Sequence, residues 1–304
     1  MLWLILAIVN AVGYAICGFF DNFITDVLFK GKKQESIKFF YGITYILTGI
    51  VLFAIFGIQD MGIGRVIWVL VAGVLSSTAS IPYYRALKDE ETTTASVFLQ
   101  LTPVIYLLAD ALIFGETING QQLLAFLIII AAPAVIVLMK KGKKNARKLE
   151  LGAAGLFIMY VVLAAASGVI TAHAGEGFDF TTTFSWFVIG RGIMDLVYFY
   201  TNPSWRKRYK YVSKHNRKAL YASLTAAQVI FLVAEFAGRY ALIIGVPALV
   251  SVTSNALEMI VVFLLGIILS IIVPKFGREK LTKNAILSHL IATILAVVGI
   301  IMLQ

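Results

Sequence analysis

The feature that most constrains this chain is a series of long apolar stretches separated by short polar loops. A helix needs about 20 apolar residues to cross the hydrocarbon core of a bilayer, and most of these stretches reach that length. Hydrophobic residues make up 60% of the 304 residues, which is typical of a membrane protein. We therefore predict ten transmembrane helices, at residues 2–29, 36–58, 64–87, 91–115, 119–139, 150–172, 180–201, 217–244, 247–273 and 281–303.

The two halves of the chain also share a sequence pattern. One constant offset aligns a run of residues in the first half with a run in the second, without an insertion. The matched positions are Ala86-Leu87 with Ala241-Leu242, Ser96-Val97 with Ser251-Val252, and Gln100 with Asn255. Such agreement indicates a duplicated unit. Two copies with an odd number of spans must be inserted in opposite orientations, as in many secondary transporters.

These patterns predict an all-α membrane protein with ten transmembrane helices, arranged as two inverted five-helix repeats. The first repeat covers residues 1–139 and the second covers residues 150–304. A basic cytoplasmic linker at residues 140–149 joins them.

The net charge of +10 comes from basic residues that gather in the loops of one predicted face. Basic loops stay in the cytoplasm during insertion, so we expect both termini to be extracytoplasmic, in a prokaryotic plasma membrane. Because topology accounts for the charge, no nucleic-acid partner is expected. The basic loops contain Lys30, Lys32, Lys33 and Lys38 after the first span, and residues 140–148, 206–218 and 275–283 further along.

The chain holds one cysteine, Cys17, so it can form neither an internal disulfide nor a multi-cysteine metal site. Its three histidines show no metal-ligand or catalytic-triad spacing. We therefore expect no metal, no cofactor and no catalytic residue. The expected partners are a small-molecule substrate and the lipid bilayer, and we expect the chain to act as a monomer or a homodimer.

Polar residues recur on one side of three predicted spans, and we expect them to bind the substrate. Their spacing follows the helical repeat. An amide turned to lipid would leave its hydrogen-bonding groups unpaired, so these stripes are expected to border a shared central cavity. The residues are Asn10, Tyr14 and Asp21 in the first span, Ser96 and Gln100 in the fourth, and Ser251, Asn255 and Glu258 in the ninth.

Two of these residues, Asp21 and Glu258, are carboxylates with no basic residue one turn away. An ionisable residue inside a span costs on the order of 2.5–3.5 kcal/mol on insertion scales, so some interaction must offset the cost. A lone carboxylate in a low dielectric also favours its protonated form. Asp21 and Glu258 are therefore the candidates for binding a proton or a cationic solute.

The other intramembrane charges come in pairs one helical turn apart. Arg191 precedes Asp195, and Glu235 precedes Arg239, so each pair can bond along its own helix. We expect both to be structural ion pairs.

Aromatic residues complete the predicted site. Tyr83 lies at the end of the third span and is expected to line the site. Tyr160 and Trp186 lie within later spans and are candidates for stacking on a bound cation.

The order of these features resembles that of the EamA-type transporters of the drug/metabolite transporter superfamily. The resemblance rests on two five-span halves, Tyr84 to Leu87 before the fourth span, Pro103 within it, Gly115-Glu116 at its end and a basic mid-chain loop. It covers nearly the whole chain and implies a carrier that moves small metabolites by alternating access. Two features depart from the family. Glu258 replaces the proline-containing pattern of the second half, and ten-span members usually have cytoplasmic termini.

The sequence thus favours a secondary-active transporter of a small polar metabolite that is cationic or zwitterionic, such as an amine or an amino acid. Proton coupling would then use Glu258 or Asp21. An uncoupled carrier of anionic or sugar-like metabolites, bound by Arg191 and Arg239, is the alternative within the same fold. A membrane enzyme or flippase subunit acting on lipid-linked substrates is the alternative from another class. We expect no enzyme, because the sequence carries no nucleophile-and-base or metal motif.

Overall fold

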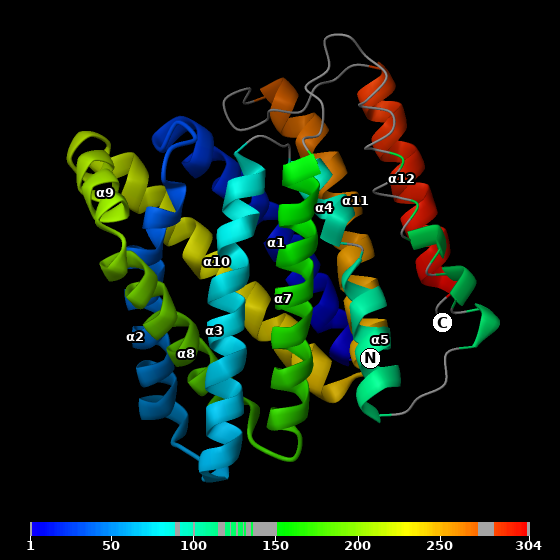
Figure 1. Cartoon of the computed structure of the whole chain (residues 1–304), viewed down its shortest axis with the longest axis horizontal. Coiled ribbons are helices and arrows are strands. Elements are labelled where there is room, and N and C mark those ends of the chain that lie inside the picture. Colours follow the sequence, from blue (N-terminus) through cyan, green and yellow to red (C-terminus); the bar gives the residue numbers. More distant parts are fainter. Residues whose placement is uncertain are drawn as a thin grey trace.

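The computed structural model of the chain is a bundle of helices (Figure 1). It describes residues 2–88, 92–99, 101–114, 151–272 and 283–302, together with residues 119–121, 123–125, 127–129, 131 and 135. Within these residues all regular secondary structure is helical. The main helices are α1 (Leu2–Phe23), α2 (Lys38–Phe56), α3 (Gly62–Leu87), α4 (Thr92–Leu99), α5 (Thr102–Phe114), α7 (Leu151–Gly175), α8 (Phe180–Thr201), α9 (Pro203–His215), α10 (Arg217–Ile244), α11 (Pro247–Ile272) and α12 (Lys283–Met302).

Helix length and composition identify a multi-pass membrane protein. Among the described residues, five segments are long and apolar enough to cross a membrane, and three shorter apolar helices accompany them. The predicted all-helical membrane class is therefore confirmed, whereas the ten spans and their inverted five-helix repeats stay predictions. The five segments are Leu2–Leu28, Gln34–Phe56, Gly62–Leu87, Gly152–Gly175 and Arg217–Ile244.

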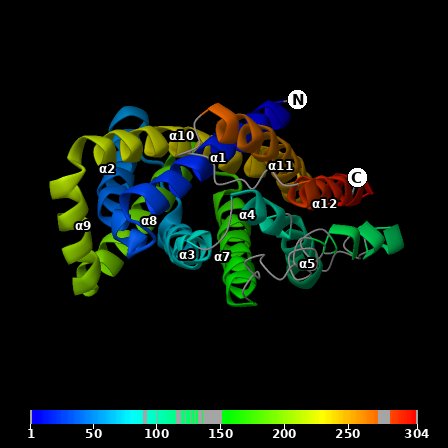
Figure 2. The ribbon, with the colours of Figure 1, turned by 90° about the horizontal axis from the view of Figure 1, so that it is seen from above.

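Helices from the two halves of the chain pack against one another. α1 runs along α10, α3 runs along α7, and α8 lies between α2 and α3. Seen from above, α2, α3 and α8 cluster on one side of the molecule, and α11 and α12 lie toward the other (Figure 2). Glycines bring α3 and α8 close together, because a Cβ on Gly73 would lie only 2.3 Å from the carbonyl oxygen of Phe187. A larger side chain there would force the two helices apart.

The predicted fourth span is two helices, α4 and α5, and not one. Pro103, the second residue of α5, has no backbone N–H to donate to the carbonyl of Leu99, four residues earlier. The Leu99 carbonyl instead accepts hydrogen bonds from Thr102 Oγ1 at 2.6 Å and from Asn255 Nδ2 at 2.9 Å. The matching part of the second half, α11, continues through Asn255 without a break.

The segment after the seventh span was expected to be a basic loop, but it is the helix α9. Pro203 starts this helix, at a position where proline is well tolerated. Trp205, Tyr209 and Val212 form a buried face against the bundle. Their spacing of four and three residues is that of an amphipathic helix, which the many intervening basic residues conceal.

The prediction that Lys38 belongs to an exposed basic loop is wrong. Lys38 is only 1% exposed and is the first residue of α2. Its ammonium group donates to the carbonyl of Ser77 at 2.8 Å and to Ser80 Oγ at 2.8 Å, and it pairs with Asp195. A buried lysine is tolerated only with such partners, so Lys38 ties α2 to α3 and α8.

Candidate functional site

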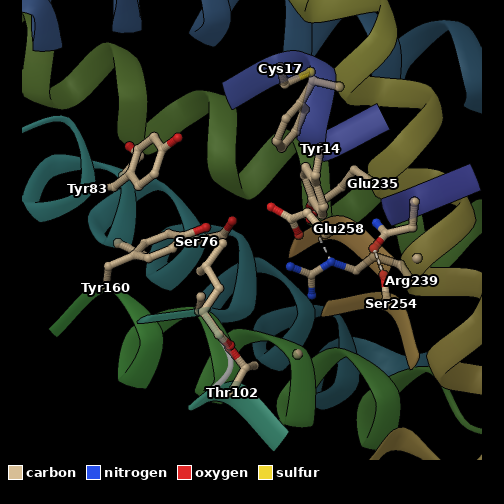
Figure 3. A pocket seen from close by; sticks show the side chains of 18 of the residues that line it. Tyr14, Cys17, Ser76, Tyr83, Thr102, Tyr160, Glu235, Arg239, Ser254 and Glu258 are labelled. Carbon is tan, nitrogen blue, oxygen red and sulfur yellow. Dashed lines mark hydrogen bonds and ion pairs between the residues drawn. The ribbon is translucent and has the colours of Figure 1, made fainter. Parts of the chain in front are cut away.

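A polar cavity of about 200 Å³ lies among the long helices (Figure 3). Most of the residues predicted to bind substrate line it, and they come from both halves of the chain. The predicted residues on its wall are Asn10, Tyr14, Asp21, Tyr83, Tyr160, Ser251, Asn255 and Glu258. Arg191, Glu235 and Arg239 line it too; they were predicted as members of structural ion pairs, with the two arginines as solute ligands in the alternative carrier.

Three other predicted residues do not contribute to the described wall. Trp186 packs on Phe53, with ring centroids 5.0 Å apart, and is not among the lining residues. It faces α2, because its position on α8 points to that helix and not to the bundle centre. Ser96 lies in α4, but its side chain is outside the described part of the structure, and so is the whole of Gln100.

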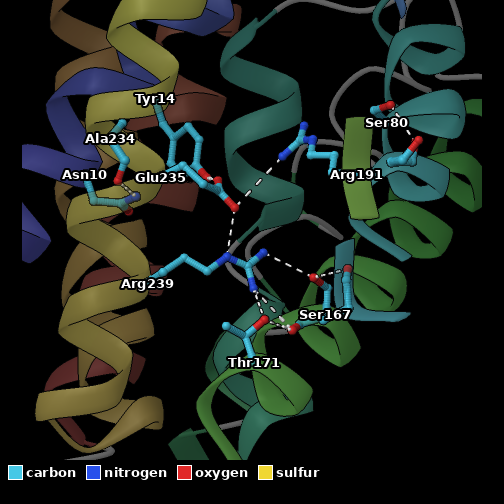
Figure 4. A network of polar contacts seen from close by, with 11 residues as sticks. Asn10, Tyr14, Ser80, Ser167, Thr171, Arg191, Ala234, Glu235 and Arg239 are labelled. Atoms are coloured by element: carbon cyan, nitrogen blue, oxygen red, sulfur yellow. Dashed lines mark hydrogen bonds and ion pairs between the residues drawn. The ribbon is translucent and has the colours of Figure 1, made fainter. Parts of the chain in front are cut away.

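Glu235 on α10 is the centre of the charged network in the cavity (Figure 4). Its carboxylate accepts a hydrogen bond from the hydroxyl of Tyr14. Arg239 Nε donates to Glu235 Oε1 at 2.8 Å, along the same helix as predicted. Arg191 NH1 lies 3.9 Å from the same oxygen. One carboxylate therefore serves two arginines from different helices.

The two arginines differ in how completely they are bound. Arg239 also donates to Thr171 Oγ1 at 2.6 Å and to the carbonyl and hydroxyl of Ser167, and it lies 3.8 Å from the ring centre of Phe187. Arg191 lies instead between the rings of Tyr45 and Phe231, and its Nε is buried with no partner among the described residues. Arg239 is thus fixed in place, whereas Arg191 keeps one donor available.

The predicted ion pair between Arg191 and Asp195 is wrong. Asp195 binds Lys38 and accepts a hydrogen bond from Ser77 Oγ at 2.6 Å, so its carboxylate faces α2 and α3. Arg191 faces Glu235 on α10. Residues four apart on a helix can meet, but here both side chains find better partners on neighbouring helices.

Two carboxylates on the cavity wall have no cationic partner within ion-pair distance among the described residues. Glu258 on α11 is 7% exposed and makes no recorded hydrogen bond or ion pair with that part of the chain. Asp21 near the end of α1 accepts a hydrogen bond from Tyr84 Oη at 3.2 Å. Burying an uncompensated carboxylate is costly, so these two groups are the open acidic sites of the cavity.

The side-chain amides on the wall differ in whether their hydrogen-bonding groups already have partners. Asn10 is occupied, because it donates to the carbonyl of Ala234 at 2.8 Å and accepts from Ser254 Oγ. Asn255 is occupied at the helix break by the carbonyl of Leu99. Gln228 on α10 is 3% exposed, and neither its Nε2 nor its Oε1 has a partner among the described residues.

Sequence reasoning did not find Gln228. A signal was present, because Gln228 precedes Glu235 by seven residues and therefore lies two turns away on the same face of α10. The signal was missed because Glu235 and Arg239 were interpreted first as a structural pair, which drew attention away from the rest of this helix face. Gln228 is the polar group on this wall that has most to gain from a bound solute.

Aromatic rings form the side of the cavity opposite α10. Tyr83 on α3 and Tyr160 on α7 are in contact, with ring centroids 5.0 Å apart. Tyr83 also contacts Tyr84 at 5.4 Å. Such rings offer both an apolar face and a hydroxyl, and their faces attract cations.

The fold and the cavity define an integral multi-pass membrane protein with a polar interior site. The family model for EamA-like transporters matches residues 1–138. Over these residues the chain is similar to the EamA-like transporter family, within the drug/metabolite transporter superfamily, and the predicted resemblance is confirmed.

Comparison with solved structures supports the fold over the whole chain. Matches extend to 27 chains of solved structures. One of these matches is a crystal structure of a protein; the alignment covers 97% of this chain and 95% of that one, with 13% sequence identity and a TM-score of 0.56. No curated protein matches the sequence.

Proposed function

We propose that the chain is a secondary-active transporter of a small polar solute that carries a positive charge, such as an amine or an amino acid. One observation carries this proposal: Glu258 and Asp21 face the cavity without a cationic partner among the described residues, while Glu235 binds both cavity arginines. A cationic group bound beside either carboxylate would offset the cost of burying it.

The size of the cavity fits a small solute. Its volume of about 200 Å³ has room for a small solute together with several water molecules. Tyr83 and Tyr160 supply faces for a cation, and Gln228 supplies both a donor and an acceptor. An amino acid carries the groups that such a wall can bind.

Alternating access between two inverted five-helix repeats would move the solute across the membrane. In the predicted repeat, α1 corresponds to α7 and α3 corresponds to α10. The packing of α1 on α10 then has its counterpart in the packing of α7 on α3, which supports this arrangement. We propose that the chain lies in a prokaryotic plasma membrane as a monomer or homodimer, with its basic loops in the cytoplasm and both termini outside.

Glu258 is the proposed site of proton coupling, with Asp21 as the second candidate. A buried carboxylate can hold either a proton or the cationic solute, and competition between the two links their fluxes. The solute is identified first, by thermal-shift measurements of the purified protein with amines, amino acids, sugars and nucleotides at two pH values.

The test uses proteoliposomes with an imposed proton gradient. Glu258→Gln should reduce uptake of the identified solute about thirtyfold or more, because losing one partner of a buried charge pair costs about 2–5 kcal/mol. Glu176→Gln removes the same charge from an exposed turn and serves as the matched control, with unchanged uptake. Uptake by Glu258→Gln equal to that of the wild type would remove Glu258 from the mechanism.

A carrier of anionic or sugar-like metabolites is a second candidate, favoured by the free Nε of Arg191. In that case Arg191→Gln should abolish solute binding, whereas Glu258→Gln should leave it intact. Arg239 is a weaker ligand for an anion, because its donors are already bound by Glu235, Ser167 and Thr171.

A membrane enzyme or flippase subunit acting on lipid-linked substrates belongs to a different class of function. The family match favours transport, since it is a match to transporters. Uptake of a soluble solute by the purified chain alone would distinguish transport from either role.

A further inference from the structure

A second concave site lies outside the cavity, at the end of the molecule where α9 is located (Figure 1). It is a groove of about 710 Å³ between the connection from α1 to α2, the last residues of α3, and α9. Three segments far apart in the sequence meet there. Six basic residues line the groove, namely Lys32, Lys33, Arg85, Lys88, Lys207 and Arg208.

The groove carries a large excess of positive charge. Glu35 is the one acidic residue on its described wall, and Arg85 Nε lies 3.1 Å from its Oε1. Lys32, Lys33 and Lys207 have no recorded ion pair with any carboxylate in the described part of the chain. Like charges gathered in this way repel one another, and a bound anion relieves the repulsion.

The groove is held in shape by specific contacts. The Arg208 guanidinium donates to the backbone carbonyl oxygens of Phe29 and Lys32, which joins α9 to the connection between α1 and α2. Gln34 Nε2 donates to the carbonyl of Tyr84 at 2.6 Å, which joins the same connection to α3. All three walls are therefore linked to one another.

Membrane topology explains how many basic residues lie on this face, but not why they converge. Arg206, Lys210 and Lys214 of α9 are exposed on the same helix and lie outside the groove. Topology would place both sets in the cytoplasm equally well. The convergence of six cations from three segments on one concave surface therefore has another cause.

The neighbourhood of the groove indicates the source of the anion. α8 presents Ile193, Val197 and Tyr200 at its outer surface, exposed by 49%, 45% and 57%. α8 ends at Thr201, and Ser204, three residues later, already lines the groove. An apolar outer face that leads directly to a basic groove fits a lipid, with its acyl chains along α8 and its headgroup among the lysines.

We propose that this groove binds the phosphate headgroup of an anionic lipid. The ligand chemistry is that of a phosphate anion, and the lipid is the source. Lys32 contributes from the connection between α1 and α2, and Lys207 contributes from α9. The groove is separate from the cavity. The proposal of a lipid site therefore does not depend on which solute the cavity binds.

The test measures lipid binding to the purified full-length chain in detergent by native mass spectrometry. The probes are phosphatidylglycerol, phosphatidylcholine and inorganic phosphate. Phosphatidylglycerol should bind the wild type more tightly than phosphatidylcholine does. Lys32→Gln/Lys207→Gln should weaken its binding about tenfold or more, because each basic residue near an anionic headgroup contributes about a fivefold factor.

The matched control is Lys210→Gln/Lys214→Gln, which removes the same charge from α9 outside the groove and should leave binding unchanged. All four side chains are exposed, so neither double variant disturbs the core. Equal weakening in both double variants would mean a diffuse attraction and would overturn the site. Inorganic phosphate binding as tightly as phosphatidylglycerol would overturn the lipid as the source.

Discussion

Glu235 and Glu258 line the same cavity but have opposite electrostatic surroundings. Glu235 holds Arg191, Arg239 and Tyr14, whereas Glu258 has no recorded partner among the described residues. Both residues are buried glutamates, so the difference comes from the side chains around them: Arg239 on the same helix as Glu235, and Tyr14 and Arg191 on neighbouring helices. We therefore propose a division of roles, in which Glu235 maintains the fold and Glu258 binds the ligand.

This contrast predicts opposite effects on stability. Glu235→Gln should destabilise the folded protein by about 3–5 kcal/mol, because it leaves two buried arginines without their carboxylate. Glu258→Gln should be neutral or stabilising, because it removes an uncompensated buried charge. Thermal unfolding in detergent at neutral pH measures both variants. A larger loss for Glu258→Gln than for Glu235→Gln would contradict the assignment.

Gln228 gives a second prediction at the same scale. Gln228→Met keeps the shape of the side chain and removes a buried amide that lacks partners, so it should stabilise the protein by about 1 kcal/mol. The same variant should weaken solute binding, because the cavity loses a donor and an acceptor. Thr225→Val, on the exposed side of α10, is the control and should change neither quantity. Unfolding temperature and solute titration together test the pair.

At the scale of the element, the break between α4 and α5 is a point of hydrogen-bonded contact between the two halves of the chain. Asn255 in α11 occupies the carbonyl of Leu99 that Pro103 leaves without its helical donor. Pro103 removes a helical donor from this carbonyl, and Asn255 supplies another donor from a different helix. Each residue should therefore contribute less to stability when the other is replaced.

A double-mutant cycle tests this coupling. Asn255→Ala alone should cost about 1 kcal/mol, because a partly buried carbonyl loses one of its two hydrogen-bond donors. In a Pro103→Ala background the new N–H at position 103 can bond to Leu99, so the same substitution should cost about 1 kcal/mol less. Chemical unfolding of the four proteins gives the coupling energy. Strict additivity would mean that the two residues act independently.

At the scale of the whole molecule, the described basic segments lie at one end. Residues 30–33 and α9 are at the upper end in Figure 1, and the marks for both termini lie below them. The turn at Glu176 follows α7 at the lower end. These positions give two reporters for orientation in the membrane.

Cysteine labelling reads these reporters directly. Cys17 is the chain's one cysteine and is buried, so Cys17→Ser provides a clean background. A membrane-impermeant maleimide applied to intact cells should label Glu176→Cys and spare Lys210→Cys, if the basic end is cytoplasmic. Labelling of Lys210→Cys alone would place the termini in the cytoplasm, as is usual for ten-span relatives.

Much of the architecture was accessible from the sequence, because apolar length and helical spacing depend on local residues. The stripe of Asn10, Tyr14 and Asp21 was found in this way, and all three residues line the cavity. Pairings between side chains of different helices could not be predicted from the sequence. The sequence could not show that Asp195 would bind Lys38, because the two residues are far apart in the chain and each had an apparent local role.

The charges on the cavity wall also constrain how the proposed transport couples to the cell. The described wall holds two arginines against three carboxylates, so its formal charge is one negative unit when all are ionised. One monovalent cation or one proton neutralises it. When a proton replaces the cationic solute, the total charge of the loaded cavity stays the same. The membrane voltage therefore does no work on the exchange. For a monovalent cationic solute, we therefore expect the proposed carrier to respond to differences in pH and solute concentration and to be electrically silent.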